Sequence, residues 1–207
     1  NNKKNSGVII SLNCETDFVG KNESFVNLAK QISEIAIGCD TVDELFNSSF
    51  DDKMSVKEKL TEQTGVIGEK IEVSAQVVKD VQVSSYVHAG NRLATIVGFN
   101  NPVDHQVARD VAMQVAAMSP IAVDKDGVDQ ETIDRELEIA KDLARQEGKP
   151  EEMLEKIAMG RLNKFFKENT LLNQAFIKDG KKSVAQYLKE HGDALSVTCF
   201  KRVGLSS

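Results

Sequence analysis

Apolar positions near the start of the chain change their spacing from two residues to three and four. The β-branched, partly alternating run at residues 7–14 predicts a strand. Apolar residues then recur at helical spacing over residues 25–36, which predicts an amphipathic helix with Asn22 as its N-cap. Shorter helical patterns occupy residues 42–46 and 56–63. We expect the second of these to end at Gly65.

Period-two alternation dominates the middle of the chain. Three runs with strand character lie at residues 71–78, 81–87 and 92–99. Because short turns connect them, we expect an antiparallel meander with one covered and one solvated face. The last run is followed by a turn and a second apolar helical stripe, residues 107–116. Strand, turn and helix thus occur twice, which suggests two related α+β lobes.

Residues 124–170 differ in composition from the rest of the chain. Of these 47 residues 22 are charged, and the apolar residues form only a narrow seam. The seam steps by three and four on both sides of a helix-breaking Gly148-Lys149-Pro150. This pattern predicts an antiparallel helical hairpin with a narrow, coiled-coil-like contact, which buries too little area to belong to the core. A helix at residues 183–190 and a strand at 195–203 that rejoins a sheet complete the expected fold.

Composition narrows the function classes. The chain has 207 residues, of which 41% are hydrophobic and 28% charged, as in ordinary soluble globular proteins. It has no apolar run of about 18 residues, so we expect no membrane span. The net charge of −6 has the wrong sign for a protein that binds nucleic acid or anionic lipid over a broad surface. The chain does not begin with Met, so we expect that it was processed, cut, or numbered from within a longer product.

Cysteine and histidine usage points to a reducing compartment and to no metal site. Cys14, Cys39 and Cys199 are odd in number and far apart, so we expect a cytoplasmic protein, or one of an organelle matrix. The three histidines are equally scattered and show no zinc-ligand spacing. A thiol enzyme would need a base for Cys14, and His88 is the candidate because it also follows a strand. This enzyme hypothesis stays open as a minor alternative.

One short segment combines an acid and a bulky aromatic at the bend between the first strand and the first long helix. Read structurally, Asp17 would be a turn acceptor and Phe18 a staple that packs on the helix. Read functionally, the pair would form an exposed tip, with Phe18 as an anchor for a pocket on a partner. By contrast, Gly180-Lys181-Lys182-Ser183 lacks the residues of a complete phosphate-binding loop, and we interpret it as a basic turn before a helix.

The chain resembles the elongation factor Ts family of bacteria and organelles over nearly its whole length. The stretch that carries this resemblance is Thr16-Asp17-Phe18-Val19 with Asn22-Glu23-Ser24-Phe25. Further stretches agree in order, at residues 67–69, 86–92, 115–120 and 160–165 with 171–174. The chain departs from the family by starting after the usual N-terminal ubiquitin-associated-like module. It also has Gln114 and Ala175 where relatives often have His and Pro.

The resemblance implies an α+β fold of two small subdomains, each an antiparallel sheet with helices, plus the protruding hairpin. The expected divisions are residues 1–75, residues 76–123 with 171–207, and the hairpin at 124–170.

It also implies a guanine-nucleotide exchange factor for the GTPase elongation factor Tu. Such a protein makes no covalent change, needs no cofactor, and acts on magnesium that belongs to the partner. The implied contact residues are Thr16, Asp17, Phe18 and Val19 at the tip, His88 on the other subdomain, and Ile67 and Gly68 framing the interface. No direct nucleic-acid contact is expected, and oligomerisation stays open. The alternative of another class is a structural or RNA-associated translation protein that uses the hairpin as a docking arm.

Overall fold

The structure is a computed structural model that describes residues 1 and 3–205. Position 2 of the first expected subdomain and positions 206 and 207 of the second lie outside the described residues. Within the described part the α-helices are α1 (Asp17–Gly20), α2 (Glu23–Ala36), α3 (Val42–Asn47), α4 (Val56–Ile67), α5 (His105–Met118), α6 (Gln130–Gln146), α7 (Leu154–Asn169) and α8 (Val184–Lys189). The strands are β1 (Ser6–Asn13), β2 (Glu72–Lys79), β3 (Gln82–Val87), β4 (Leu93–Phe99), β5 (Ala175–Phe176), β6 (Asp179–Ser183) and β7 (Val197–Gly204). The fold class is α+β, as the sequence predicts.

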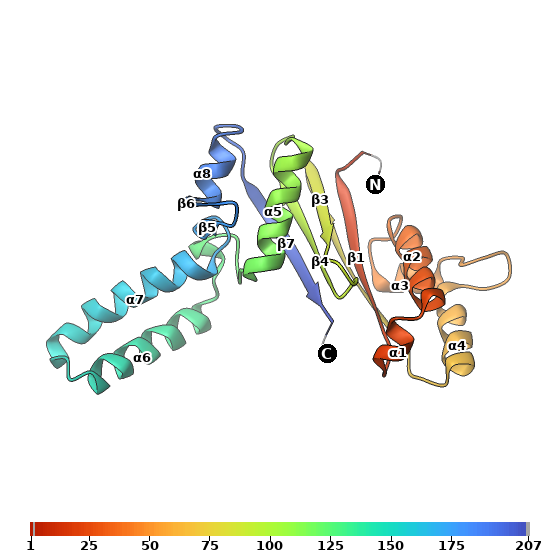
Figure 1. The fold of residues 1–207 in the computed structure, drawn as a ribbon, viewed down its shortest axis with the longest axis horizontal. Helices are drawn as coiled ribbons and strands as arrows, with labels where there is room; N and C mark the ends of the chain where they lie inside the picture. Colours follow the sequence, from red (N-terminus) through yellow and green to blue (C-terminus); the bar gives the residue numbers. More distant parts are fainter. Residues whose placement is uncertain (2, 206–207) are drawn as a thin grey trace.

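Four layers make up the body of the molecule. From right to left in Figure 1 they are helices α2–α4, the sheet β1–β2, the sheet β3–β4–β7 and helix α5. All pairings within the two sheets are antiparallel. The short β5–β6 hairpin and α8 pack beside α5, and the α6–α7 hairpin projects from that end of the body.

Strand β4 is buried on both faces and lies at the centre of these layers. Val97 and Phe99 pack in a core with α5, while Ile96, on the other face of the strand, packs against the β1–β2 sheet. All three side chains are fully buried. A strand covered on both faces needs apolar residues at successive positions, which explains the continuous apolar run of β4.

Strand β1 joins two cores through the alternation of its side chains. Val8, Ile10 and Leu12 pack with α2–α4, whereas Ile9 faces the three-stranded sheet. Gly7 lies on the same face as Ile9, where a Cβ would come within 2.5 Å of Ile96 Cδ1. The absence of a side chain at Gly7 therefore allows the two sheets to approach each other.

The expected three-strand meander is wrong in its first strand. β2 pairs over its whole length with β1, from Ser6↔Lys79 to Asn13↔Glu72, whereas β3 pairs with β4. The chain passes from one sheet to the other between β2 and β3. The backbone before β1 holds this connection, because Asp80 N–H donates to Asn5 O and Val83 N–H donates to Lys4 O. Alternation predicts a strand and its two faces but does not identify its partner. The expected subdomain boundary after residue 75 falls inside β2, and the division into subdomains stays a prediction.

Several local predictions can be compared with the helix ends. Asn22 is the N-cap of α2, where its side chain accepts from Ser24 N–H at 2.9 Å. The predicted stop of α4 at Gly65 is wrong, because the helix continues to Ile67 and its C-cap is Gly68 in the left-handed region, at φ 77°. Glycine ends a helix where the backbone turns left-handed, and Gly65 keeps helical geometry. The predicted C-terminal strand does rejoin a sheet, as β7 beside β4.

The α6–α7 hairpin follows the predicted seam. Its buried residues are Ala140, Ala144, Leu154, Ala158 and Leu162. Beside the seam, an ion pair crosses between the two helices from Lys141 to Glu155 at 3.1 Å, and Arg145 of α6 pairs at 3.2 Å with Glu151 in the 3-10 turn just before α7. Because much of the seam is alanine, the helices bury little area against each other, which is consistent with a slender projection (Figure 1).

A buried amide pair connects the base of this hairpin to α5. Gln114 and Gln174 are almost fully buried, and their side chains hydrogen-bond at 3.2 Å. Gln114 also accepts from Ile177 N–H at 2.8 Å, while Gln174 donates to Glu168 O at 3.0 Å. A buried amide that uses both its donor and its acceptor fixes its surroundings strongly, so the base of the hairpin is held in one orientation.

We predict that Gly7→Ala lowers the free energy of unfolding by about 1–3 kcal/mol, because the new Cβ overpacks the contact between the sheets. Ile96→Val removes the Cδ1 atom that the methyl group would meet, so the double variant should lose less than the sum of the two single changes. Urea unfolding of the four proteins measures this coupling. Gly160→Ala in α7, where the Cβ would meet open space, is the control and should stabilise by up to about 1 kcal/mol. Strict additivity of Gly7→Ala and Ile96→Val would contradict the proposed contact.

Candidate functional site

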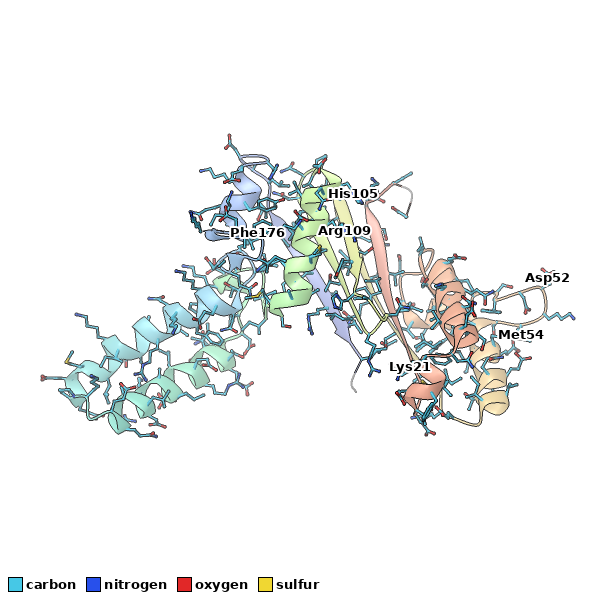
Figure 2. The ribbon with its side chains drawn as sticks, in the orientation of Figure 1. Lys21, Asp52, Met54, His105, Arg109 and Phe176 are labelled. Carbon is cyan, nitrogen blue, oxygen red and sulfur yellow. The ribbon has the colours of Figure 1, made fainter. Side chains whose placement is uncertain are left out.

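The acid–aromatic segment forms the single-turn helix α1, directly after β1. Thr16 is its N-cap, and Asp17 in the first turn pairs with Lys21, which Figure 2 labels at the lower end of the body. The Lys21 ammonium is the main cause that lowers the pKa of Asp17. Phe18 is 84% exposed, so it is not the helix staple of the structural reading. Val19, on the other side of the turn, packs against the core under α2.

A carboxylate from a distant part of the chain holds the start of α1. Glu69 accepts hydrogen bonds from Thr16 Oγ1 at 2.5 Å, Thr16 N–H at 2.9 Å and Glu15 N–H at 3.0 Å. These bonds, first that of the Thr16 hydroxyl, lower the pKa of Glu69. Sequence analysis did not select Glu69 as a site residue, although it belongs to one of the stretches that carry the family resemblance.

Ile67 and Gly68, the two residues before Glu69, form the corner between α4 and the segment that contacts α1. Ile67 ends α4 and packs against the core under α2, and Gly68 turns the chain with its positive φ. Val66, one residue earlier, is 74% exposed. Ile67 and Gly68 thus belong to the corner that carries Glu69, and an exposed apolar side chain accompanies them.

His88 lies in the turn between β3 and β4 and is exposed. Its backbone N–H donates to Leu93 O at 2.8 Å, and its Nδ1 lies 2.9 Å from the Tyr86 hydroxyl. Helix α5 in turn holds Tyr86: the guanidinium of Arg109, which Figure 2 labels on α5, lies over the Tyr86 ring at 5.7 Å from its centroid. Tyr86 therefore orients the His88 ring and leaves Nε2 for another contact, a role that sequence analysis did not assign.

The β3–β4 turn and α1 lie at the same end of the body. In Figure 1 both are at its lower edge, and Arg92 of that turn contributes to lowering the pKa of Asp17 on α1. The structure thus brings together the four tip residues, the corner at Ile67 and Gly68, and the turn that carries His88.

Cys14 does not have the environment of a nucleophile. Burial and the nearby Glu69 carboxylate raise the pKa of its thiol, and Sγ donates to Thr16 O at 3.2 Å. A nucleophilic cysteine needs a lowered pKa, and the Nδ1 atom of its candidate base His88 faces Tyr86. The geometry therefore disfavours the thiol-enzyme hypothesis.

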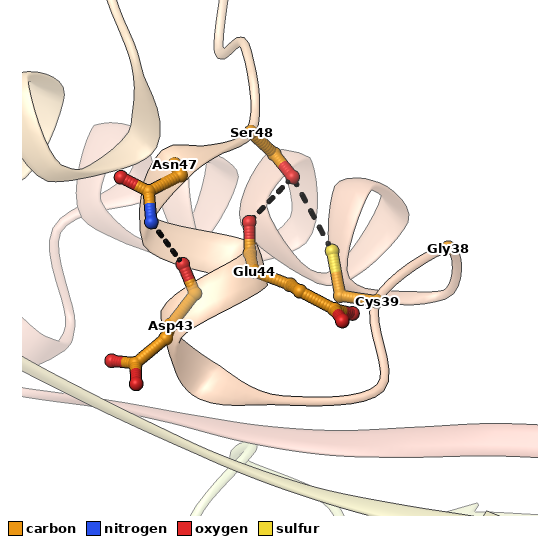
Figure 3. Close-up of a pocket in the computed structure, with 6 residues that line it drawn as sticks. All are labelled: Gly38, Cys39, Asp43, Glu44, Asn47 and Ser48. Carbon is orange, nitrogen blue, oxygen red and sulfur yellow. Dashed lines mark hydrogen bonds between the residues drawn. The ribbon is translucent and has the colours of Figure 1, made fainter.

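A shallow hollow of about 450 Å³ lies elsewhere, between the end of α2 and helix α3. Figure 3 shows that its polar groups bond to one another, since Ser48 bridges Cys39 Sγ and Glu44 O while Asn47 donates to Asp43 O. Among residues 1 and 3–205, no group of three or more His, Cys, Asp or Glu side chains is placed to hold a metal ion. The helices in this part of the chain are too short or too polar to cross a membrane.

Comparisons with known proteins agree with the resemblance seen in the sequence. The family model described as elongation factor TS matches residues 15–206. The elongation factor Ts of Christiangramia forsetii is 52% identical over 208 residues, covering 99% of this chain and 76% of that protein. Those of Flavobacterium psychrophilum and Clostridium botulinum are 50% and 40% identical, and each match covers 96% of this chain, with 73% and 70% of the relative.

The same substitution at an exposed and at a buried phenylalanine should have different effects on stability. Phe18→Ala should change the free energy of unfolding by less than about 0.5 kcal/mol, because water already reaches most of the ring. Phe25→Ala, the same change at a side chain that is 5% exposed in α2, should cost about 3–5 kcal/mol because it leaves a cavity. Thermal and urea unfolding of both variants measure the difference. Equal losses would mean that Phe18 is a core residue.

Proposed function

This chain belongs to the elongation factor Ts family, whose members act in translation elongation, and we propose that it is the guanine-nucleotide exchange factor for elongation factor Tu. The observation that carries the proposal is the exposed Phe18 on a turn that is fixed at its start by Glu69. An apolar ring that is held out into water in a defined orientation is suited to fill a pocket on a partner. Such a factor breaks no covalent bond and is not an enzyme in that sense.

The tip would act by insertion. In the family, an Asp-Phe pair enters between helices of the GTP-binding domain and disturbs the magnesium site of the partner. Asp17 and Phe18 match this pair, and the half-buried Val19 supports the turn that presents them. The magnesium ion belongs to elongation factor Tu, and the chain itself would contribute shape and one carboxylate.

His88 would make the second contact, at the phosphate-binding loop of the partner. The β3–β4 turn that carries His88 lies at the same end of the body as α1 (Figure 1), which supports joint action, since one partner surface could meet both. Because Nδ1 is hydrogen-bonded to the Tyr86 hydroxyl, Nε2 is the ring nitrogen that would contact the partner. Ile67, Gly68 and the exposed Val66 would border this surface.

Exchange follows from a coupling free energy. The factor binds the nucleotide-free GTPase more tightly than the GDP-bound GTPase. It therefore weakens the binding of GDP to the GTPase, and GDP weakens the binding of the factor to the GTPase by the same ratio. Release and rebinding are both accelerated, so the cellular excess of GTP would set the direction.

We predict that Phe18→Ala slows GDP release from elongation factor Tu by about thirtyfold at limiting factor concentration, equivalent to about 2 kcal/mol of binding free energy. Asp17→Ala should also slow release, and the two losses should not add, because one insertion event uses both side chains. Release of fluorescent GDP, with and without the unaltered chain, measures the effect. Val81→Ala, at another apolar side chain that is 55% exposed, is the control and should not change the rate. If the unaltered chain does not accelerate release, the proposed function is wrong.

The α6–α7 hairpin would serve as a second docking arm. A Gly-Ser linker in place of residues 130–167 keeps the bond between Leu171 N–H and Ala122 O at the base. We expect this variant to unfold cooperatively and to bind elongation factor Tu more weakly. Circular dichroism and titration calorimetry measure the two properties. Loss of cooperative unfolding would show that the hairpin is a structural part of the body.

A further inference from the structure

All the hydrogen bonds of the Glu69 carboxylate go to one short segment of the chain. Its three hydrogen bonds all come from Glu15 and Thr16, the two residues that precede α1, and they span from 2.5 to 3.0 Å. The donors are two consecutive amides and the hydroxyl of the N-cap. An ionised acceptor makes each of these bonds stronger than a neutral one would.

The carboxylate is itself attached to a rigid part of the protein. Helix α4 is anchored by the buried Val56 and Leu60, and the left-handed Gly68 directs the chain back toward α1. Glu69 then leads into β2, whose first residue pairs with the last residue of β1. Both ends of the segment that carries Glu69 are therefore fixed.

Helix α1 is short, and its own bonds are local. The bond from Val19 N–H to the Thr16 hydroxyl is long, at 3.5 Å, and Asp17 pairs with Lys21 within the same turn. A single helical turn is unstable on its own in water. The orientation of α1 thus depends on contacts from outside: Val19 packs on the core under α2, and Glu69 provides three bonds where the turn begins.

We propose that Glu69 is a positioning residue that holds α1 in the orientation in which Phe18 can enter a partner, an inference that rests on the proposed exchange function. A tip that is already ordered does not lose conformational freedom on docking. When the clamp is broken, only a fraction of molecules present the tip correctly, and the apparent affinity falls by that fraction. The maximal rate, reached once the tip is inserted, is unaffected.

Glu69→Gln tests the clamp with almost no change in size. Oε2 of Glu69 accepts from both amides and Oε1 accepts from the Thr16 hydroxyl. A glutamine can offer its single oxygen to the two amides, but its NH₂ group then replaces the acceptor that faces the hydroxyl, and the bonds to the amides lose their ionised partner. Glu72→Gln is the matched control, because it removes the same charge nearby from a side chain that pairs with Lys70. Both changes are made in the full chain, alone and together with Phe18→Ala.

Two measurements separate positioning from a general structural role. In the free protein, Glu69→Gln should speed hydrogen exchange of the Glu15 and Thr16 amides by about tenfold or more, as expected when a charged hydrogen-bond partner is lost. In GDP release, it should raise the concentration of the chain for half-maximal rate by about tenfold at an unchanged maximal rate. The melting temperature should stay within a few degrees of that of Glu72→Gln, and Glu69→Gln should add nothing in the Phe18→Ala background.

The outcomes distinguish the two proposals. Unchanged exchange of the two amides, a loss that adds fully to that of Phe18→Ala, or a loss matched by Glu72→Gln would each overturn the clamp. An unaltered chain that does not release GDP would refute the exchange function. Amide exchange, which needs no partner, would then still decide whether Glu69 holds α1.

Discussion

The contact between the two sheets determines the arrangement of everything else. Strand β4 is buried between α5 and the β1–β2 sheet, and this sheet is in turn covered by α2–α4. Because Gly7 has no side chain, β1 lies close over Ile96, and the two sheets form one continuous body. The ends of β1 and β3 then lie at one edge, which brings α1 and the His88 turn together. A shift of one sheet against the other would separate the two proposed contacts with a partner.

The sequence was most informative where structure is local. Helical spacing and caps predicted α2 and the α6–α7 hairpin, because residues three and four apart share a helix face whatever the rest of the fold does. It failed at the partner of β2, since the β1 residues that pair with it are remote in sequence. It also placed the end of α4 too early, at Gly65, because Gly65 and Gly68 are both possible terminators and only the positive φ of Gly68 distinguishes them.

The candidate site likewise contains residues that the sequence indicates and residues that only the structure shows. Asp17 and Phe18 attract attention in the sequence because an acid and a bulky aromatic lie together at the bend between a predicted strand and a predicted helix. Glu69 and Tyr86 do not, because each acts on a neighbour, Glu69 on Thr16 and Tyr86 on His88, and contacts of this kind appear only in three dimensions. The family resemblance marked the stretches that contain both residues without giving their roles. Side chains that orient other side chains are the part of a site that sequence patterns reveal least.

The position of β7 in the central sheet has a consequence for how the protein is made. β4 has β3 on one side and β7 on the other, with Leu93 opposite Gly204, so the sheet stays incomplete until β7 has left the ribosome. The α6–α7 hairpin, synthesised in between, depends on contacts that are near in sequence and can form at once. The open edge of β4 is thus exposed to wrong partners during synthesis, and the nascent chain is most prone to aggregation after β4 and before β7.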